Sequence, residues 1–150
     1  MRGVILRMFA MGTSNGNERA LEWLQQWEDL INAADFEGAR RLFSPDVVSF
    51  GTLVSFMTGL QELEIKQWRN VWPKIKDFKF ADSKVFPAGG QMSAVVVTCR
   101  WQSKGLAPDG SWYDRKGRAT LVLSDENGQF RCCHSHLSLD PGVPARQAPA

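Results

Sequence analysis

The spacing of apolar residues changes at Pro73, and this change limits the possible folds more than any other feature of the sequence. Before Pro73, apolar residues such as Trp23, Trp27 and Ile31 recur every three or four positions, the period of a helix that buries one side. After Pro73 the period becomes two, and Val95–Thr98 lies in the segment with the strongest preference for a strand. Helices followed by strands in one chain predict an α+β fold.

Local signals divide the helical half into separate elements. Apolar positions at helical spacing run from Ala20 to Ala34, after which Asp35 can cap a second, shorter helix over residues 36–43. That helix is expected to end at Pro45, because a residue before proline is pushed away from helical geometry.

A short strand at residues 47–50 comes next, and Thr58 and Gln61 have the spacing of a capping box for a third helix that Pro73 stops.

The second half of the chain predicts four strands, over residues 78–86, 92–103, 118–123 and 129–139. A β-bulge is expected near Asp82-Ser83, and Asn127-Gly128 marks a tight turn. Strands joined by turns this short must pair antiparallel. The sequence therefore predicts three N-terminal helices on one face of a strongly curved antiparallel sheet, with the other face open to water or to a second subunit.

The chain of 150 residues suits one domain with a sizeable core. Small polar residues before the first helix predict a disordered lead-in over residues 1–18, and repeated prolines predict an extended tail over residues 141–150. The folded domain is expected to occupy residues 19–140.

Charge and cysteine content narrow the class of protein. Lys and Arg number 18 against 16 Asp and Glu, a balance that argues against nucleic acid and against an anionic membrane as partners. An odd count of three cysteines, two of them adjacent, does not suit a disulfide framework. The apolar run at the start is interrupted by Arg7 and is too short for an export signal or a membrane span, so a cytoplasmic protein is expected.

The order of elements, the segment Asn32–Gly38 and the closing His134–Ser138 resemble the nuclear transport factor 2-like superfamily, and within it the SnoaL-like and ketosteroid-isomerase-like branch. The resemblance covers roughly residues 19–140. It implies a cone-shaped, cystatin-like fold that encloses a pocket, and a homodimer through the outer sheet face. Members include isomerases, cyclases, dehydratases and non-catalytic assembly modules, so the fold alone does not select a reaction.

The acid–base pair of the best-known relative is missing. Ketosteroid isomerase chemistry needs a carboxylate base and a hydrogen-bond donor for the enolate oxygen. By the resemblance, Trp27 stands where the donating tyrosine would be and Gly51 stands near the position of the base. The nearest carboxylate, Asp46, follows Pro45 in a sequence typical of turns and is expected to be solvated. This departure disfavours catalysis by that pair.

A second relative, the association domain of calmodulin-dependent kinase, has arginines in its pocket. By that resemblance Arg100 matches one of them, while Leu121 and Leu137 occupy the other two positions. Two interpretations of Arg100 stay open: a salt bridge at the pocket rim, or an anchor for a carboxylate or carbonyl ligand. The expected pocket is otherwise apolar, with Trp27, Phe50, Trp68 and Trp72 as aromatic walls, although such residues at helical spacing also suit a plain core.

His134 and His136 lie two apart on the last predicted strand and therefore share one face. If Leu137 lines the pocket, the histidines face the outer surface, whereas a bulge would invert this. In the inverted case His136, with Asp114 or Tyr113, is a candidate acid–base group. No third histidine accompanies the pair, so neither a metal nor another cofactor is predicted.

The sequence leaves three hypotheses about function. The leading one is a SnoaL-like domain whose pocket binds a small organic molecule, flat or acidic. The second is an isomerase, cyclase or dehydratase that uses a non-standard pair such as His136 with Asp114 or Tyr113. The third is a dimerisation or assembly module whose working surface is the outer sheet face.

Overall fold

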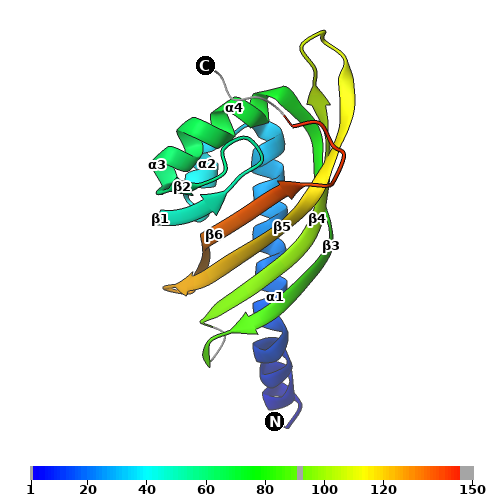
Figure 1. The fold of residues 1–150 in the computed structure, drawn as a ribbon. Coiled ribbons are helices and arrows are strands. Elements are labelled where there is room, and N and C mark those ends of the chain that lie inside the picture. Colours follow the sequence, from blue (N-terminus) through cyan, green and yellow to red (C-terminus); the bar gives the residue numbers. More distant parts are fainter. Residues whose placement is uncertain (1, 91–92, 146–150) are drawn as a thin grey trace.

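The computed structural model describes residues 2–90 and 93–145 of the chain (Figure 1). Helices and one short hairpin come first, and four long strands fill the second half. The elements are α1 (Arg2–Ala33), α2 (Phe36–Arg40), β1 (Phe43–Phe50), β2 (Met57–Thr58), α3 (Leu60–Leu63), a π-helical turn (Glu64–Trp68), α4 (Arg69–Val71), a 3-10 turn (Trp72–Lys74), β3 (Ile75–Ala88), β4 (Ala94–Leu106), β5 (Trp112–Glu126) and β6 (Gln129–Leu139). Within the described residues, no helix is long and apolar enough to cross a membrane.

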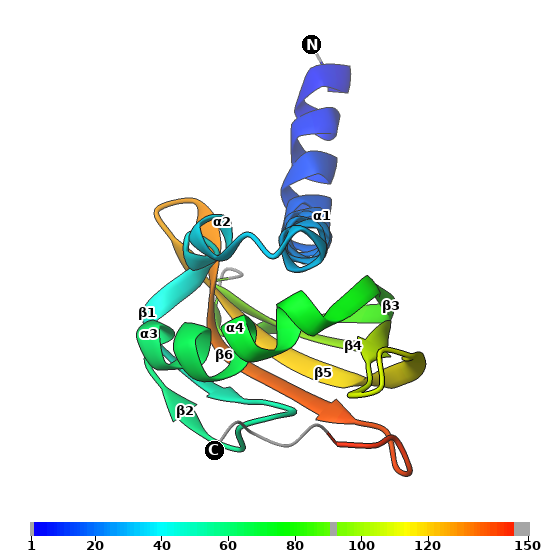
Figure 2. The same ribbon diagram turned by 90° about the horizontal axis from the view of Figure 1, so that it is seen from above.

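A single apolar stripe fixes α1 against the sheet. The buried positions of this stripe are Ala20, Trp23, Leu24, Trp27 and Ile31. The helix ends where Ala34 adopts a left-handed φ of 49° and the Asp35 N–H donates back to the Leu30 carbonyl. Residues 2–18, where the sequence predicts a disordered lead-in, continue α1 as helical backbone that projects beyond the sheet (Figures 1 and 2).

Asp35 caps α2 as the sequence predicts, because its Oδ1 accepts a hydrogen bond of 2.9 Å from the Gly38 N–H. The helix is shorter than expected, however, and ends at Arg40. Phe43, expected on the buried face of this helix, instead begins β1 and pairs with Cys132 of β6. Pairing with a strand distant in sequence overrides the local helical pattern here.

The third helical segment, Leu60–Lys74, lies between β2 and β3 rather than ahead of the sheet, so the prediction of three N-terminal helices is only partly right. Its π-helical turn fits an extra residue into the helix, so that Glu64, Gln67 and Trp68 are all buried. Glu64 forms ion pairs with Arg40 and Arg69, which connect α2 to α4. The hydrogen bond from Arg40 is the main reason that the pKa of Glu64 lies below its ordinary value of 4.5.

The six-stranded sheet has the order β2-β1-β6-β5-β4-β3. Its four long strands pair antiparallel, as their short connections require. The prediction of a fully antiparallel sheet is wrong at one place, because β1 lies parallel to β6. Two strands from opposite ends of the chain meet there, and no turn constrains their direction. All helical segments cover the same face of the curved sheet (Figure 2).

The predicted bulge near Asp82 is confirmed. The pairing of β3 with β4 shifts between Ala81 and Lys84, and Asp82 has a φ of 54°. The free edge of β3 is covered by α1, whose Asn32 side chain accepts a hydrogen bond from the Phe78 N–H and donates one to its carbonyl. A side chain thus takes the place of a further strand and protects the edge.

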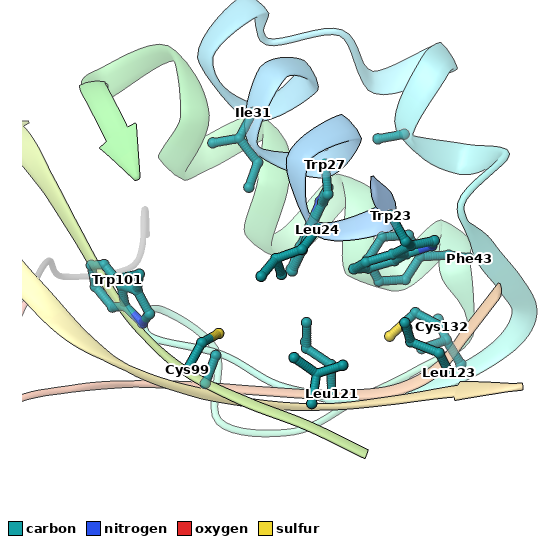
Figure 3. Packing of buried hydrophobic residues seen from close by; sticks show 14 of the residues in the cluster. Trp23, Leu24, Trp27, Ile31, Phe43, Cys99, Trp101, Leu121, Leu123 and Cys132 are labelled. Atoms are coloured by element: carbon teal, nitrogen blue, oxygen red, sulfur yellow. The ribbon is translucent and has the colours of Figure 1, made fainter. Parts of the chain in front are cut away.

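The core lies between α1 and one face of the sheet, which we name the covered face (Figure 3). On β5, residues with odd numbers from Arg115 to Leu123 are buried on this face, and their neighbours point to the opposite side. Leu121 pairs with Val97 on β4 and is fully buried, as is Leu123. The side that carries the even-numbered neighbours is the outer face.

Candidate functional site

A small cavity of about 40 Å³ remains between the covered face, α1 and the Leu60–Lys74 segment. A site for one water needs roughly 10–15 Å³, so the cavity holds a few small atoms, whereas sites for drug-sized ligands measure roughly 300–1,000 Å³. The cone is therefore almost filled by its own side chains. The lining residues are Trp27, Ile31, Phe50, Gly51, Thr52, Leu63, Gln67, Trp68, Val71, Trp72, Ile75, Phe78, Arg115, Ser135 and Leu137.

Aromatic rings from α1 and the Leu60–Lys74 segment form most of one wall. Trp68 stacks on Trp72 with ring centroids 4.7 Å apart. Phe43 joins the two helical elements, because its ring contacts Trp68 at 4.9 Å and Trp27 at 5.1 Å. Interlocked rings of this kind make rigid, flat walls.

A polar chain forms the opposite wall. Arg115 of β5 donates a hydrogen bond of 2.7 Å from Nη2 to Thr52 Oγ1. Gln67 donates to the same hydroxyl from Nε2 at 3.0 Å, and its Oε1 accepts from the Leu53 and Val54 N–H groups. The π-helical turn therefore has a function in the fold: it turns Gln67 inward to hold the loop after β1.

Arg115 is the charged group of this cavity. Only 4% of the residue is exposed, and its guanidinium lies 4.8 Å from the ring centroid of Trp101. A buried guanidinium is costly unless hydrogen-bond acceptors surround it. The Thr52 hydroxyl supplies one such acceptor.

Gly51 also lines the cavity, and a side chain at this position would have to displace Gln67. A Cβ at this position would lie 2.6 Å from Gln67 Oε1. Gln67 thus fills the space into which a carboxylate side chain at position 51 would extend. A neutral amide, whose oxygen already accepts from two backbone N–H groups, therefore occupies this space.

Trp27 and Trp23 differ in one respect that bears on the cavity. Both are buried on α1, and Trp23 Nε1 donates a hydrogen bond of 3.1 Å to the Leu42 carbonyl. Trp27 Nε1 has no hydrogen-bond partner among the described residues, although only 2% of Trp27 is exposed. An unmade hydrogen bond on a buried donor costs roughly 1–3 kcal/mol, so such a donor needs an explanation.

The predicted pocket residues separate into two groups. Trp27, Phe50, Trp68, Trp72 and Leu137 line the cavity. Leu121 is fully buried but belongs to the core beneath the cavity rather than to its lining.

Arg100 is the clear correction, because it is exposed on the outer face. Its neighbours Cys99 and Trp101 face inward instead, and the alternation of β4 leaves no other choice. Neither interpretation of Arg100 at the pocket therefore holds. The cavity arginine is Arg115, which the sequence analysis missed. Its position could have been found by counting back in twos from Ala119 and Leu121 on β5.

The two histidines lie on the outer face. The pairing of β5 with β6 contains a bulge at Cys133, so that Cys132 and Ser135 both face inward and His134 and His136 do not. His134 Nδ1 lies 2.7 Å from the Val48 carbonyl. Because a carbonyl only accepts, Nδ1 carries a hydrogen and donates it. Phe50 makes edge contacts with both imidazoles, at 4.9 and 5.2 Å.

The suggested acid–base set does not come together. His136 pairs with Thr120, and Asp114 lies six positions further along β5, a separation of about 20 Å. Asp114 instead forms an ion pair with Lys104, whose hydrogen bond lowers the pKa of that carboxylate. Neither these two residues nor Tyr113 lines the cavity.

The cysteines and the possible metal ligands form no further site within the described residues. Burial raises the pKa of the Cys99 thiol to about 12, and burial also raises that of Cys132. Within residues 2–90 and 93–145, no group of three or more His, Cys, Asp or Glu side chains is placed to hold a metal ion.

Comparisons with known proteins agree with this architecture. The SnoaL-like domain family matches residues 21–141 of the chain, and the protein therefore belongs to that family. Its fold is the cystatin-like fold that is also seen in solved structures of nuclear transport factor 2-like proteins. No curated protein matches the chain in sequence.

Three solved structures illustrate the breadth of the fold. An uncharacterised cystatin-like protein from Caulobacter vibrioides is 14% identical, with a TM-score of 0.71, and the match covers 85% of this chain and 92% of that one. A nuclear transport factor 2-like protein from Salmonella enterica is 19% identical, with a TM-score of 0.70 and coverage of 89% and 94%. The association domain of C. elegans CaMKII is 18% identical, with a TM-score of 0.64 and coverage of 84% and 98%. At these identities the likeness shows the fold alone.

Proposed function

We propose that this SnoaL-like domain binds a compact organic molecule through an oxygen acceptor that enters its cavity. The observation that supports the proposal is the unpartnered Nε1–H of Trp27, a residue of the cavity wall, among the described residues. A carbonyl or carboxylate oxygen in the cavity would complete this donor. The same donor explains why a tryptophan occupies the position of the donating tyrosine in the resembled isomerases.

The cavity wall restricts the chemistry of the ligand. Arg115 favours an anion or a strong acceptor, and Trp68 and Trp72 favour a flat apolar body. The volume of about 40 Å³ restricts the ligand to a few heavy atoms beyond its acceptor group. We therefore infer a small carboxylic acid or carbonyl compound.

Binding is the better-supported activity, because the cavity lining, within the described residues, contains no group suited to take a proton. Glu64 is the buried carboxylate nearest in sequence to the lining residue Gln67, and both of its oxygens are engaged by Arg40 and Arg69. An indole N–H donates but does not act as a base. The isomerase, cyclase or dehydratase alternative would need a proton acceptor supplied by the ligand itself.

Thermal unfolding with a panel of small aliphatic carboxylates and ketones tests the proposal. A ligand at about 100 times its Kd should stabilise the native protein by ~2.7 kcal/mol, seen as a rise in Tm. Trp27→Phe should remove most of this rise while preserving the fold. Trp23→Phe is the matched control, since Trp23 already has its partner, and it should keep the ligand-induced rise.

A second variant keeps the test decisive if Trp27→Phe unfolds. Arg115→Met keeps much of the side-chain volume and should abolish stabilisation by carboxylates more than stabilisation by ketones. If no compound of the panel raises Tm, or if Trp27→Phe and Trp23→Phe respond alike to the same compound, the proposed binding site is wrong.

A homodimer through the outer face is the second candidate function. The nearly filled cavity and the likeness to an association domain support it. A row of outer-face residues crosses the sheet and offers a surface to bury: Phe86, Val96 and Val122, then His134, then Val48. Light scattering should give twice the chain mass, and Val122→Lys should return it to one. A single-chain mass for the unmodified protein would exclude this dimer.

A further inference from the structure

The outer face carries a group of basic side chains at one end of β3, β4 and β5. Neighbouring strands bring them together in rows, because residues paired across a sheet share a face. One row joins Arg100 to Arg118, another joins Lys79 to Lys116 through Gln102, and a third joins Lys76 to Lys104. We name this surface the basic face: Lys76, Lys79, Lys84, Arg100, Lys104, Lys116 and Arg118.

The cations of the helical side are neutralised, whereas most of those on the basic face are not. From residue 16 to residue 73, every Lys and Arg lies in an ion pair with a carboxylate, namely Arg19, Arg40, Arg41, Lys66 and Arg69. On the basic face, ion pairs involve only Lys104, with Asp114, and Arg118, with Asp140, within the part of the chain that the structure describes. Lys76, Lys79, Lys84, Arg100 and Lys116 have no carboxylate within 4.0 Å among the described residues.

The pair Arg100 and Arg118 shows that this charge is only partly compensated within the described chain. The two residues lie directly opposite each other on antiparallel strands, where like charges repel. Asp140 lies 3.8 Å from Arg118, whose side chain is 56% exposed, so water screens the attraction. The balanced total charge of the sequence conceals this segregation.

We propose that the basic face binds an acidic segment of a partner protein. Unpaired exposed cations on a sheet favour a partner of opposite charge, and such contacts set the rate and specificity of association. An extended segment places alternate side chains on one side about 7 Å apart, which matches the spacing of successive outer-face residues along β4 and β5. Asp and Glu at alternate positions would meet these cations in register. The site is separate from the cavity and from the row of outer-face residues that runs from Phe86 to Val48.

A protein segment fits this surface better than a nucleic acid. Single-stranded nucleic acids bind through phosphates and through bases stacked on open aromatic rings. Trp112 is the exposed aromatic residue of this region, and Lys76 Nζ covers it at 4.2 Å from the ring centroid. A second copy of the chain, with the same face, would bring cations against cations.

Fluorescence anisotropy with the full chain and a labelled peptide of about ten residues, Glu alternating with Ser, tests the proposal. We expect binding that weakens as salt rises. Arg100→Gln with Arg118→Gln should weaken it about tenfold. Both residues are exposed, so the fold should be kept, which Tm checks. Arg41→Gln is the matched control on the helical side and should bind as the unmodified chain does.

Three outcomes would overturn the proposal. The first is no binding of the acidic peptide at physiological salt. The second is equal binding by the Arg100→Gln, Arg118→Gln protein and the Arg41→Gln protein. The third is tighter binding of a single-stranded oligonucleotide of equal charge, which would assign the basic face to nucleic acid instead. None of these results bears on the cavity, whose test uses Tm and carboxylates.

Discussion

Similar residues have opposite environments on the two faces of the sheet. Arg115 and Lys116 are neighbours on β5, yet Arg115 lies against Trp101 with a hydrogen bond to Thr52, whereas Lys116 is exposed and, among the described residues, has no ion pair. The covered side satisfies most of its polar side chains internally, and Trp27 is the cavity-lining residue whose donor is left over. The outer face leaves charges unpaired. The groups left without a partner on each face are the basis of the two proposals. The indole N–H of Trp27 suits a ligand with an acceptor in the cavity, and the unpaired cations suit an acidic segment on the outer face.

Neighbouring aliphatic residues of β5 should show the largest difference between the faces. Leu121 is fully buried, so Leu121→Ala should lower the free energy of unfolding by about 3 kcal/mol. Val122, on the outer face, should cost about 1 kcal/mol on substitution by Ala. Urea denaturation of both variants measures the contrast. Equal losses would mean that the outer face is buried as well, as a tight dimer requires.

Removing the buried carboxylate on the helical side should have the next largest effect. Glu64→Gln leaves Arg40 and Arg69 without their ion-pair partner and should cost about 2 kcal/mol at neutral pH. Because the folded pKa of Glu64 is lowered, its stabilisation is present above about pH 4.5 and is lost as pH falls further. Chemical denaturation at pH 7 and at pH 3 should show the difference between variant and parent shrinking in acid. An equal difference at both values would contradict this account.

The two tryptophans of α1 should differ by a smaller amount. Trp23→Phe removes one of the two hydrogen bonds that the Leu42 carbonyl accepts, the other coming from the Cys132 N–H. Trp27→Phe removes a donor that has no partner among the described residues. Trp23→Phe should therefore be the more destabilising by about 1 kcal/mol in the absence of ligand. The measurement is the Tm of each variant. The reverse order would show that Trp27 Nε1 already has a partner in solution.

The smallest effect is expected at Arg100. Arg100→Gln removes one member of a like-charged pair, so the free energy of unfolding should change by less than about 0.5 kcal/mol, with a slight gain at low salt. Denaturation at low and high salt is the measurement. A loss above about 1 kcal/mol would instead mean that Arg100 makes a stabilising contact, contrary to its exposed position.

Much of this fold can be predicted from the sequence, because many of its features depend on residues that are close together in the chain. The stripe on α1, the cap at Asp35 and the bulge at Asp82 all depend on residues close together in the chain. Phe43 was misassigned because its partner, Cys132, is distant in sequence. The parallel pairing of β1 with β6 was missed for the same reason.

The candidate site was harder to predict than the fold. The helical spacing of Trp27, Trp68 and Trp72 predicts only that these residues are buried. The resemblance indicates Arg100, whereas the alternation of β5 turns Arg115 inward. The bulge at Cys133 could not be placed from sequence, so the face of His134 and His136 stayed open. The small volume of the cavity depends on how Gln67 and the rings pack, which no local pattern specifies.

The position of β6 in the sheet has a consequence for synthesis of the protein. The strand of this sheet that is synthesised after the other five, Gln129–Leu139, is the one inserted between β1 and β5. Until it arrives, β1 has only the two-residue strand β2 beside it, and no strand joins β1 to β5. Closing a contact between Phe43 and Cys132 late costs loop entropy and slows folding. Nascent chains that end before Gln129 should therefore leave β1 unpaired on the side that β6 occupies in the folded protein.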